Sequence, residues 1–157
     1  MTTPEEVIQA AMDRGLTLAC AESLTGGALC TALVSVPGSS EVVLGGIVTY
    51  TVGVKEDVLG VDPAIIEAHG VVSRETAIAM AKRVREMFGA EVGAATTGAA
   101  GPEPHGGKPA GTVCVASVGP NGEVAWERHH DGPRGAVQRA AVADALEAYA
   151  HAVGEIG

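Results

Sequence analysis

Ser23 stands where an apolar segment, residues 16–21, gives way to a turn rich in small polar residues and glycine. The turn reads Glu22-Ser23-Leu24-Thr25-Gly26-Gly27. A serine in a strand-to-helix turn faces backbone N–H groups, and each such donor to a developing oxyanion contributes about 3–4 kcal/mol of transition-state stabilisation. The turn lacks the G-x-S-x-G pattern of a nucleophile elbow. Two interpretations stay open: a nucleophile, or a helix N-cap followed by a tight turn.

A nucleophilic serine needs a base, and Lys55 is the candidate. Of the three lysines, it alone follows a predicted strand end directly, in a loop that begins at Tyr50. Burial can lower the pKa of a lysine from about 10.4 toward neutrality, where the amine accepts a proton. The five histidines lie at a predicted helix end, in a glycine-rich loop or in polar segments. The alternative for Lys55 is a solvated side chain at a helix start.

A second glycine-rich segment, residues 96–102, is a candidate phosphate-binding loop. Its donors are the Thr96 and Thr97 hydroxyls and the backbone N–H groups around Gly98 and Gly101. It is not a P-loop, because no Lys-Ser or Lys-Thr follows the glycines. Arg134 and Arg139 could pair with the same phosphate, although surface salt bridges would explain both arginines equally well.

The hydrophobic pattern predicts helices that alternate with strands over most of the chain. We expect helices over residues 3–15, 28–36, 55–59, 62–69, 73–88 and 134–153. We expect strands over residues 16–21, 42–50, 92–96, 112–118 and 123–129, the last two forming a hairpin. Gly45-Gly46 indicates a bulge or a close backbone approach. Residues 97–109 read as a long loop.

This order predicts an α/β fold: a three-layer α/β/α sandwich around a mixed sheet. The 157 residues fit a single domain, 1–157. Ligands of such sheets bind at the carboxyl ends of strands. The loops that hold Ser23, Lys55 and the second glycine-rich segment all follow predicted strands, so we expect them to meet there.

The composition excludes several classes of protein. A hydrophobic fraction of 46% with 18% charged residues excludes a disordered chain. The net charge of −9, without a basic block, argues against a nucleic-acid partner. No apolar run approaches the roughly 20 residues of a membrane helix, and three cysteines without CxxC spacing indicate reduced thiols in a cytoplasmic protein. No Cys/His/Asp cluster has metal-ligand spacing, so we expect neither a metal nor another cofactor.

Taken together, these segments resemble the CinA C-terminal domain family, whose stand-alone members are nicotinamide mononucleotide amidases. The matching segments are Ala21–Gly27, Pro37–Ser40, Val48–Tyr50 with Lys55, Leu59–Val61, His69–Ser73, Thr97–Pro102, Lys108–Val113, and Arg134 with Arg139. Each motif alone is weak evidence for the resemblance. The ordered series, which covers nearly the whole chain, is specific.

The resemblance implies hydrolysis of the carboxamide of nicotinamide mononucleotide to nicotinic acid mononucleotide and ammonia. Ser23 would be the nucleophile, Lys55 its base and Tyr50 a hydrogen-bond partner of that pair. The substrate-binding residues would be Glu22, Thr25, Gly26, Gly27, Thr96, Thr97, Gly98, Gly101 and Arg139. The chain departs from the family at Thr51-Val52, where a Ser-Asn pair is usual, so one hydrogen-bonding side chain is lost.

Three hypotheses follow for the function. The first is the amidase just described, which needs only a small nucleotide substrate. The second is a catalytically silent nucleotide-binding module, favoured by Val52. The third is an amidase of the same mechanism acting on another small carboxamide. Membrane and nucleic-acid partners are not expected, and the composition permits a homodimer.

Overall fold

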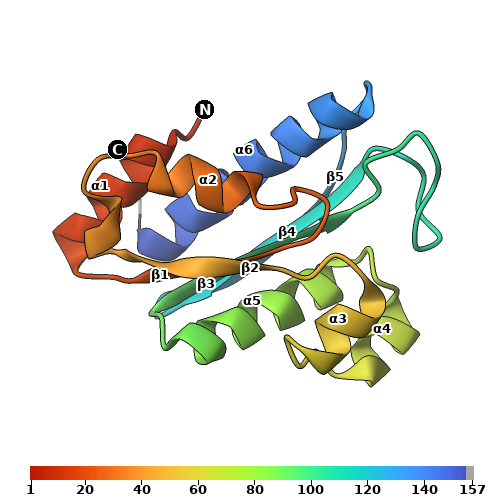
Figure 1. Cartoon of the computed structure of the whole chain (residues 1–157), viewed down its shortest axis with the longest axis horizontal. Coiled ribbons are helices and arrows are strands. Elements are labelled where there is room, and N and C mark those ends of the chain that lie inside the picture. The colour runs from red at the N-terminus through yellow and green to blue at the C-terminus, as the bar shows by residue number, and fades with distance from the viewer. Residues whose placement is uncertain (155–157) are drawn as a thin grey trace.

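The computed structural model describes residues 1–154, and within them the chain forms six α-helices and five strands (Figure 1). In chain order the elements are α1 (Pro4–Arg14), β1 (Leu18–Glu22), α2 (Ala28–Val34), a 3-10 turn (Ser39–Glu41), β2 (Val43–Val48), α3 (Val52–Asp57), α4 (Pro63–His69), α5 (Arg74–Phe88), β3 (Val92–Gly98), β4 (Thr112–Gly119), β5 (Gly122–His129) and α6 (Arg134–Val153). The single-domain prediction also covers residues 155–157, which lie outside the described residues.

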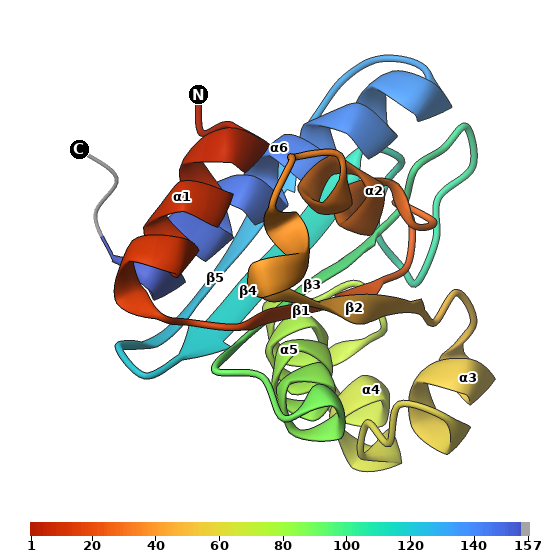
Figure 2. The ribbon, with the colours of Figure 1, turned by 60° about the vertical axis from the view of Figure 1, so that its left-hand side comes forward.

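The strands form one mixed sheet in the order β2-β1-β3-β4-β5. β1 runs parallel to both of its neighbours, β2 and β3, whereas β4 is antiparallel to β3 and to β5. The carboxyl ends of β1, β2 and β3 therefore share one edge of the sheet, and the loops that leave them lie there together (Figure 2). In open α/β sheets this is the edge where ligands bind.

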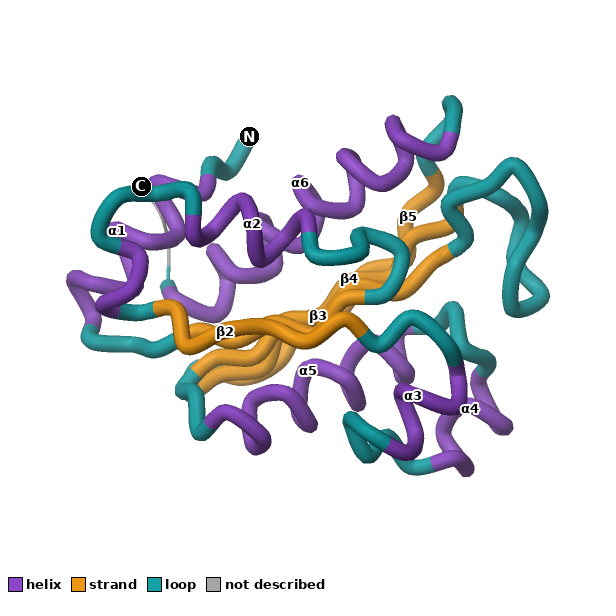
Figure 3. The backbone as a smooth tube through the Cα atoms, in the orientation of Figure 1, coloured by secondary structure: helices purple, strands orange, loops and turns teal. Residues whose placement is uncertain are grey.

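Helices cover both faces of the sheet. α1, α2 and α6 lie on one face and α5 on the other, with α3 and α4 beyond one end of α5 (Figure 3). One buried apolar cluster fills each space between helices and sheet, built mainly from alanine, valine and leucine. The predicted three-layer α/β/α sandwich around a mixed sheet is confirmed.

The first helix forms where it was predicted. Thr3 and Glu6 form a reciprocal capping box at the start of α1, and Gly15 ends the helix in the left-handed conformation. Several other boundaries differ from the prediction, and two of them lie at the candidate site. α3 begins at Val52 rather than Lys55, because the Thr51 hydroxyl accepts the Val54 N–H and caps the helix there.

The other of these two boundaries lies in the second glycine-rich segment. Thr97 and Gly98 continue β3 and pair with β4, so the loop begins two residues later than predicted. The two residues belong to the strand because they pair with β4. This pairing joins segments that are separated by a loop, so the local sequence pattern does not indicate it.

The glycine pair in β2 has the predicted role. The register between β1 and β2 shifts beside Gly45, so a bulge lies there. A Cβ on Gly45 would lie 2.8 Å from the Phe88 ring, and a Cβ on Gly46 would lie 2.7 Å from Cys20 Sγ. The close approach of α5 on one side and of β1 on the other therefore requires glycine at both positions.

The three cysteines are free thiols in the structure. Cys20 and Cys114 are buried, whereas Cys30 is partly exposed. Among the described residues, no helix is both long and apolar enough to cross a membrane.

Candidate active site

Ser23 follows the last residue of β1 and is 6% exposed. Its backbone N–H donates a hydrogen bond to Thr96 Oγ1 on β3, at 3.2 Å. Its hydroxyl lies 3.3 Å from the carbonyl oxygen of Tyr50, beyond the end of β2. The side chain is thus held where the three parallel strands end, as the chain order predicted.

Lys55 reaches the same place from α3. Its side chain is fully buried, and its Nζ lies 2.8 Å from Ser23 Oγ. Two backbone carbonyl oxygens complete its surroundings: that of Thr49 at 2.7 Å and that of Tyr50 at 3.0 Å. No carboxylate is among these partners, so nothing in contact with the amine favours its charged form over its neutral form by opposite charge.

Burial lowers the pKa of the Lys55 ammonium from its ordinary 10.5 to about 8. The three partners fit both protonation states. A charged ammonium donates its three N–H bonds to Ser23 Oγ and the two carbonyl oxygens. A neutral amine has only two N–H bonds, which the carbonyl oxygens accept, so its lone pair is left to accept the Ser23 O–H. This is the arrangement that a general base needs.

A buried polar chain supports the turn around Ser23. Glu22 accepts the Thr25 hydroxyl at 2.6 Å and the Leu29 and Cys30 N–H groups at 2.8 and 3.0 Å. The Thr25 and Thr96 hydroxyl oxygens are 2.9 Å apart. The Ser23 N–H donates to the Thr96 hydroxyl, which can donate to the Thr25 hydroxyl, which in turn donates to the Glu22 carboxylate. This chain of hydrogen bonds fixes the backbone at Ser23.

An open cavity of about 420 Å³ lies in front of Ser23. Its walls are the loop after β1, the start of α3, the loop after β3 and the first residue of α6. They comprise Ser23, Leu24, Tyr50, Thr51, Val52, Gly98, Ala100, Gly101, Pro102, Glu103, Pro104, His105 and Arg134. The volume lies in the range of small-molecule sites. Among the described residues, the backbone N–H groups of Leu24 and Ala100, two residues that line this cavity, donate no hydrogen bond.

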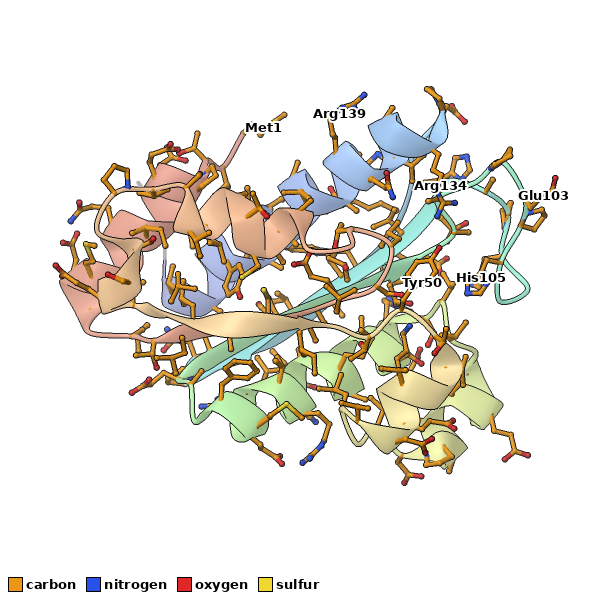
Figure 4. All side chains as sticks on the ribbon, viewed as in Figure 1. Met1, Tyr50, Glu103, His105, Arg134 and Arg139 are labelled. Carbon is orange, nitrogen blue, oxygen red and sulfur yellow. The ribbon has the colours of Figure 1, made fainter. Side chains whose placement is uncertain are left out.

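Arg134 spans the mouth of this cavity. Its guanidinium donates to the carbonyl oxygen of Gly101 at 2.6 Å and to the Tyr50 phenol oxygen at 2.9 Å. The Tyr50 side chain is 57% exposed, and Figure 4 shows it with His105 and Arg134 on the same side of the molecule. Tyr50 thus meets the Ser23–Lys55 pair through its carbonyl oxygen, while its phenol contacts Arg134.

Several predicted substrate-binding residues lie away from the cavity. Thr97 points to the other face of the sheet, where its hydroxyl donates to the Val71 carbonyl oxygen at 2.8 Å. Arg139 projects from the outer side of α6 (Figure 4) and lines a separate depression with Thr25. Glu22, Thr25 and Thr96 are buried beneath Ser23 rather than in the cavity. Gly26 and Gly27 form the turn into α2, where the Gly27 N–H donates to Glu22. Of the predicted binding set, Gly98 and Gly101 line the cavity.

Sequence reasoning missed the carbonyl oxygens of Thr49 and Tyr50 as partners of the amine. Backbone groups carry no signal in residue type, so no pattern could have identified them. It also missed that the Thr49 hydroxyl, alone among the buried side-chain polar atoms of the described residues, has no hydrogen-bond partner.

Comparisons with known proteins agree with this architecture. The family model of the CinA C-terminal domain matches residues 1–153. A "CinA-like protein" of Frankia casuarinae is 46% identical over 136 residues, and one of Chlorobaculum tepidum is 50% identical over 132 residues. The matches cover 87% and 81% of this chain but 31% of each relative. The chain therefore spans about a third of the length of these relatives.

Solved structures of CinA proteins also superpose on this chain. A CinA superfamily protein of Klebsiella pneumoniae superposes with a TM-score of 0.90 at 31% identity, over 96% of this chain and 94% of that one. A competence/damage inducible protein of Agrobacterium tumefaciens gives a TM-score of 0.81 at 37% identity, over 94% and 95%. From the family match and these superpositions, the chain belongs to the CinA family and corresponds to its C-terminal domain.

Proposed function

We propose that this chain is a serine amidase that hydrolyses the carboxamide of nicotinamide mononucleotide to nicotinic acid mononucleotide and ammonia. The observation that carries the proposal is the 2.8 Å contact between Ser23 Oγ and the buried Nζ of Lys55. The contact lies at the ligand-binding edge of the sheet and opens onto a cavity of suitable size.

Acylation begins when Ser23 Oγ attacks the carboxamide carbon and its proton moves to the neutral Lys55 amine. The π pair of the carbonyl moves onto oxygen and makes a tetrahedral oxyanion. The backbone N–H groups of Leu24 and Ala100 are the candidate donors to that oxyanion. The oxyanion then collapses, the C–N bond breaks, and Lys55 returns the proton to the leaving nitrogen. Ammonia departs, and an ester remains on Ser23.

Deacylation uses the same two groups. Water attacks the ester carbonyl and gives a proton to the Lys55 amine. The second tetrahedral oxyanion collapses, the Ser23 oxygen leaves and recovers the proton from Lys55, and the carboxylic acid is released. The enzyme is regenerated with Ser23 protonated and Lys55 neutral.

The positive charge of Arg134 at the mouth of the cavity favours an anionic substrate. Arg134 places a guanidinium beside the opening, and a planar guanidinium suits two oxygens of a phosphate. Arg139, which the sequence favoured for this role, faces away from the cavity.

The test is ammonia release from nicotinamide mononucleotide by the purified chain. Ser23→Ala and Lys55→Met should each lower kcat at least a thousandfold, whereas Ser35→Ala and Lys82→Met are matched controls, because both residues are exposed and distant in the fold from the cavity. A covalent adduct on Ser23, trapped by acid quench and found by mass spectrometry, would support the ester. Equal rates for wild type and Ser23→Ala would refute the assignment.

Val52 favours the two other hypotheses. It lines the cavity and is 37% exposed, yet it offers no hydrogen bond where the family usually has asparagine. Calorimetry that finds saturable mononucleotide binding without turnover would support a silent binding module. A panel of small carboxamides, with turnover of another member and none of the mononucleotide, would support a different substrate.

A further inference from the structure

Two cysteines lie next to each other between the sheet and α2. Cys20 belongs to β1 and Cys30 to α2. Both sulfurs border the space in front of Gly46, because a Cβ on that glycine would lie 2.7 Å from Cys20 Sγ and 3.2 Å from Cys30 Sγ. The missing side chain of Gly46 therefore leaves room for the two sulfurs beside one another.

The Glu22 carboxylate contacts both cysteines. Its Oε2 atom accepts the Cys30 N–H at 3.0 Å and lies 4.0 Å from Cys20 Sγ. One oxygen atom thus holds the backbone of one cysteine and the sulfur of the other. This contact fixes the first turn of α2 against the end of β1, and it keeps the two thiols together.

The two thiols differ in exposure and in acidity. Cys30 is partly exposed, whereas Cys20 is fully buried. A hydrogen bond from the Cys20 S–H lowers the pKa of the Cys30 thiol from 9.0 to about 7, although burial and the charge of Glu22 act in the opposite direction. The same hydrogen bond, burial and Glu22 raise the pKa of Cys20 well above 9.0. The pair therefore combines an accessible thiol that ionises near neutral pH with a buried thiol beside it, an arrangement typical of redox-sensitive cysteines.

Cys114 lacks this arrangement. It lies on β4 in the apolar cluster beside α5, so the sheet separates it from Cys20 in the other cluster. Burial raises the pKa of its thiol to about 12. Cys114 is therefore an inert buried thiol and an internal control for the other two.

We propose that Cys20 and Cys30 are a redox pair that hydrogen peroxide oxidises to a disulfide. The Cys30 thiolate attacks one peroxide oxygen, the O–O bond breaks, and the hydroxide that leaves takes up a proton to become water. Two electrons have passed from sulfur to peroxide, and Cys30 is a sulfenic acid. The Cys20 sulfur then attacks the Cys30 sulfur, the S–S bond forms, the S–O bond breaks, and the hydroxyl leaves as water with the Cys20 proton. In total, two thiols and one hydrogen peroxide give one disulfide and two waters.

The disulfide encloses the turn that carries Ser23. Residues 21–29 lie between the two cysteines and include the whole turn from Glu22 to Gly27. Oxidation therefore ties the two ends of this turn together by a covalent bond. The proposal concerns the thiols alone and does not depend on the amidase reaction, so the two stand or fall separately.

The first experiment treats the reduced, purified chain with hydrogen peroxide and follows free thiols and intact mass. We expect loss of two of the three thiols, a fall in mass of about 2 Da for the two hydrogen atoms removed, and full reversal by dithiothreitol. A glutamate-specific protease cuts after Glu22, between the two cysteines, so the oxidised chain should give these two peptides joined. Cys114→Ala is the matched control and should form the same disulfide.

The second experiment separates the roles of the two thiols. Cys20→Ser keeps a hydroxyl donor beside Cys30 but removes the second sulfur, so we expect the Cys30 sulfenic acid to accumulate and to be trapped by dimedone. Cys30→Ser should keep its mass under the same peroxide treatment, because Cys20 is buried and un-ionised. Cys30→Ser changes only a partly exposed side chain, and it keeps the proposal falsifiable if Cys20→Ser fails to fold.

Four outcomes overturn the proposal. One is a wild-type chain that retains three thiols under peroxide. Another is a disulfide that includes Cys114 or joins two chains, because Cys20 and Cys30 are then not partners. A third is a Cys30 that is oxidised further to sulfinic acid without forming a disulfide. The last is a folded Cys30→Ser variant whose Cys20 is still oxidised, because Cys30 is then not the thiol that reacts with peroxide.

Discussion

The carbonyl oxygen of Tyr50 accepts a hydrogen bond from Lys55 at 3.0 Å, while the phenol of the same tyrosine extends to the mouth of the cavity. Tyr50 therefore joins the base to the substrate entrance through two different groups. Only the phenol can be removed by substitution, and this separates its role from that of the backbone.

Tyr50→Phe should lower kcat less than tenfold and act mainly on KM. The variant keeps the carbonyl oxygen that orients Lys55 and loses only the bond from Arg134. Steady-state kinetics beside Lys55→Met is the measurement. A thousandfold fall in kcat for Tyr50→Phe would mean that the phenol takes part in proton transfer.

The pH dependence of the reaction follows from the state of Lys55. The base must be neutral, and the pKa of its ammonium is about 8 in the folded chain. We expect kcat/KM to rise about tenfold per pH unit below pH 8 and to level off above it. The measurement is kcat/KM between pH 6 and 9.5. A flat profile over that interval would remove Lys55 as the base.

The same pKa change makes stability depend on pH. Between about pH 8 and 10.5 the unfolded chain holds a proton on Lys55 that the folded chain has lost, so the contribution of Lys55 to the free energy of unfolding rises with pH in this window. The full rise is about 3 kcal/mol, from the difference between the two pKa values. Urea unfolding at pH 7 and 10.5 is the measurement, and the free energy of unfolding of wild type relative to that of Lys55→Met should increase by this amount, because burial raises the pKa of the Cys114 thiol and changes the stability of both proteins alike. Parallel behaviour of the two proteins would contradict it.

Thr49→Val should increase stability by about 1 kcal/mol without loss of activity. The Thr49 hydroxyl is buried without a partner, and an apolar group of the same shape avoids that desolvation cost. The carbonyl oxygen that holds Lys55 belongs to the backbone and is retained. Chemical unfolding and ammonia release are the two measurements. A destabilised or inactive variant would reveal a partner for this hydroxyl.

Val52→Asn tests whether the departure from the family sequence weakens catalysis. Val52 lines the cavity, so an amide there gains access to the substrate, and one added hydrogen bond of about 1 kcal/mol corresponds to a roughly fivefold change in kcat/KM. We expect an increase of that size on nicotinamide mononucleotide. Val52→Leu is the control without a polar group. An unchanged rate for both would show that this position does not contact the substrate.

The sequence by itself determined the elements and the candidate pair. Caps such as Thr3 and Gly15, the apolar periods and the Asn121-Gly122 hairpin signal are local, so the chain order of helices and strands could be derived from them. Ser23 and Lys55 could be proposed because each follows a strand, and parallel strands bring their carboxyl ends together.

Only the tertiary structure decided the chemistry around that pair. The depth at which Lys55 is buried and the two carbonyl oxygens that orient its amine arise from packing between α3, β1 and β2, which no local pattern encodes. The same holds for the arginines: a helix turns 100° per residue, so Arg134 meets the cavity while Arg139, five residues later, faces a different side of α6. Thr96 and Thr97 differ for a similar reason, since adjacent strand residues point to opposite faces of the sheet.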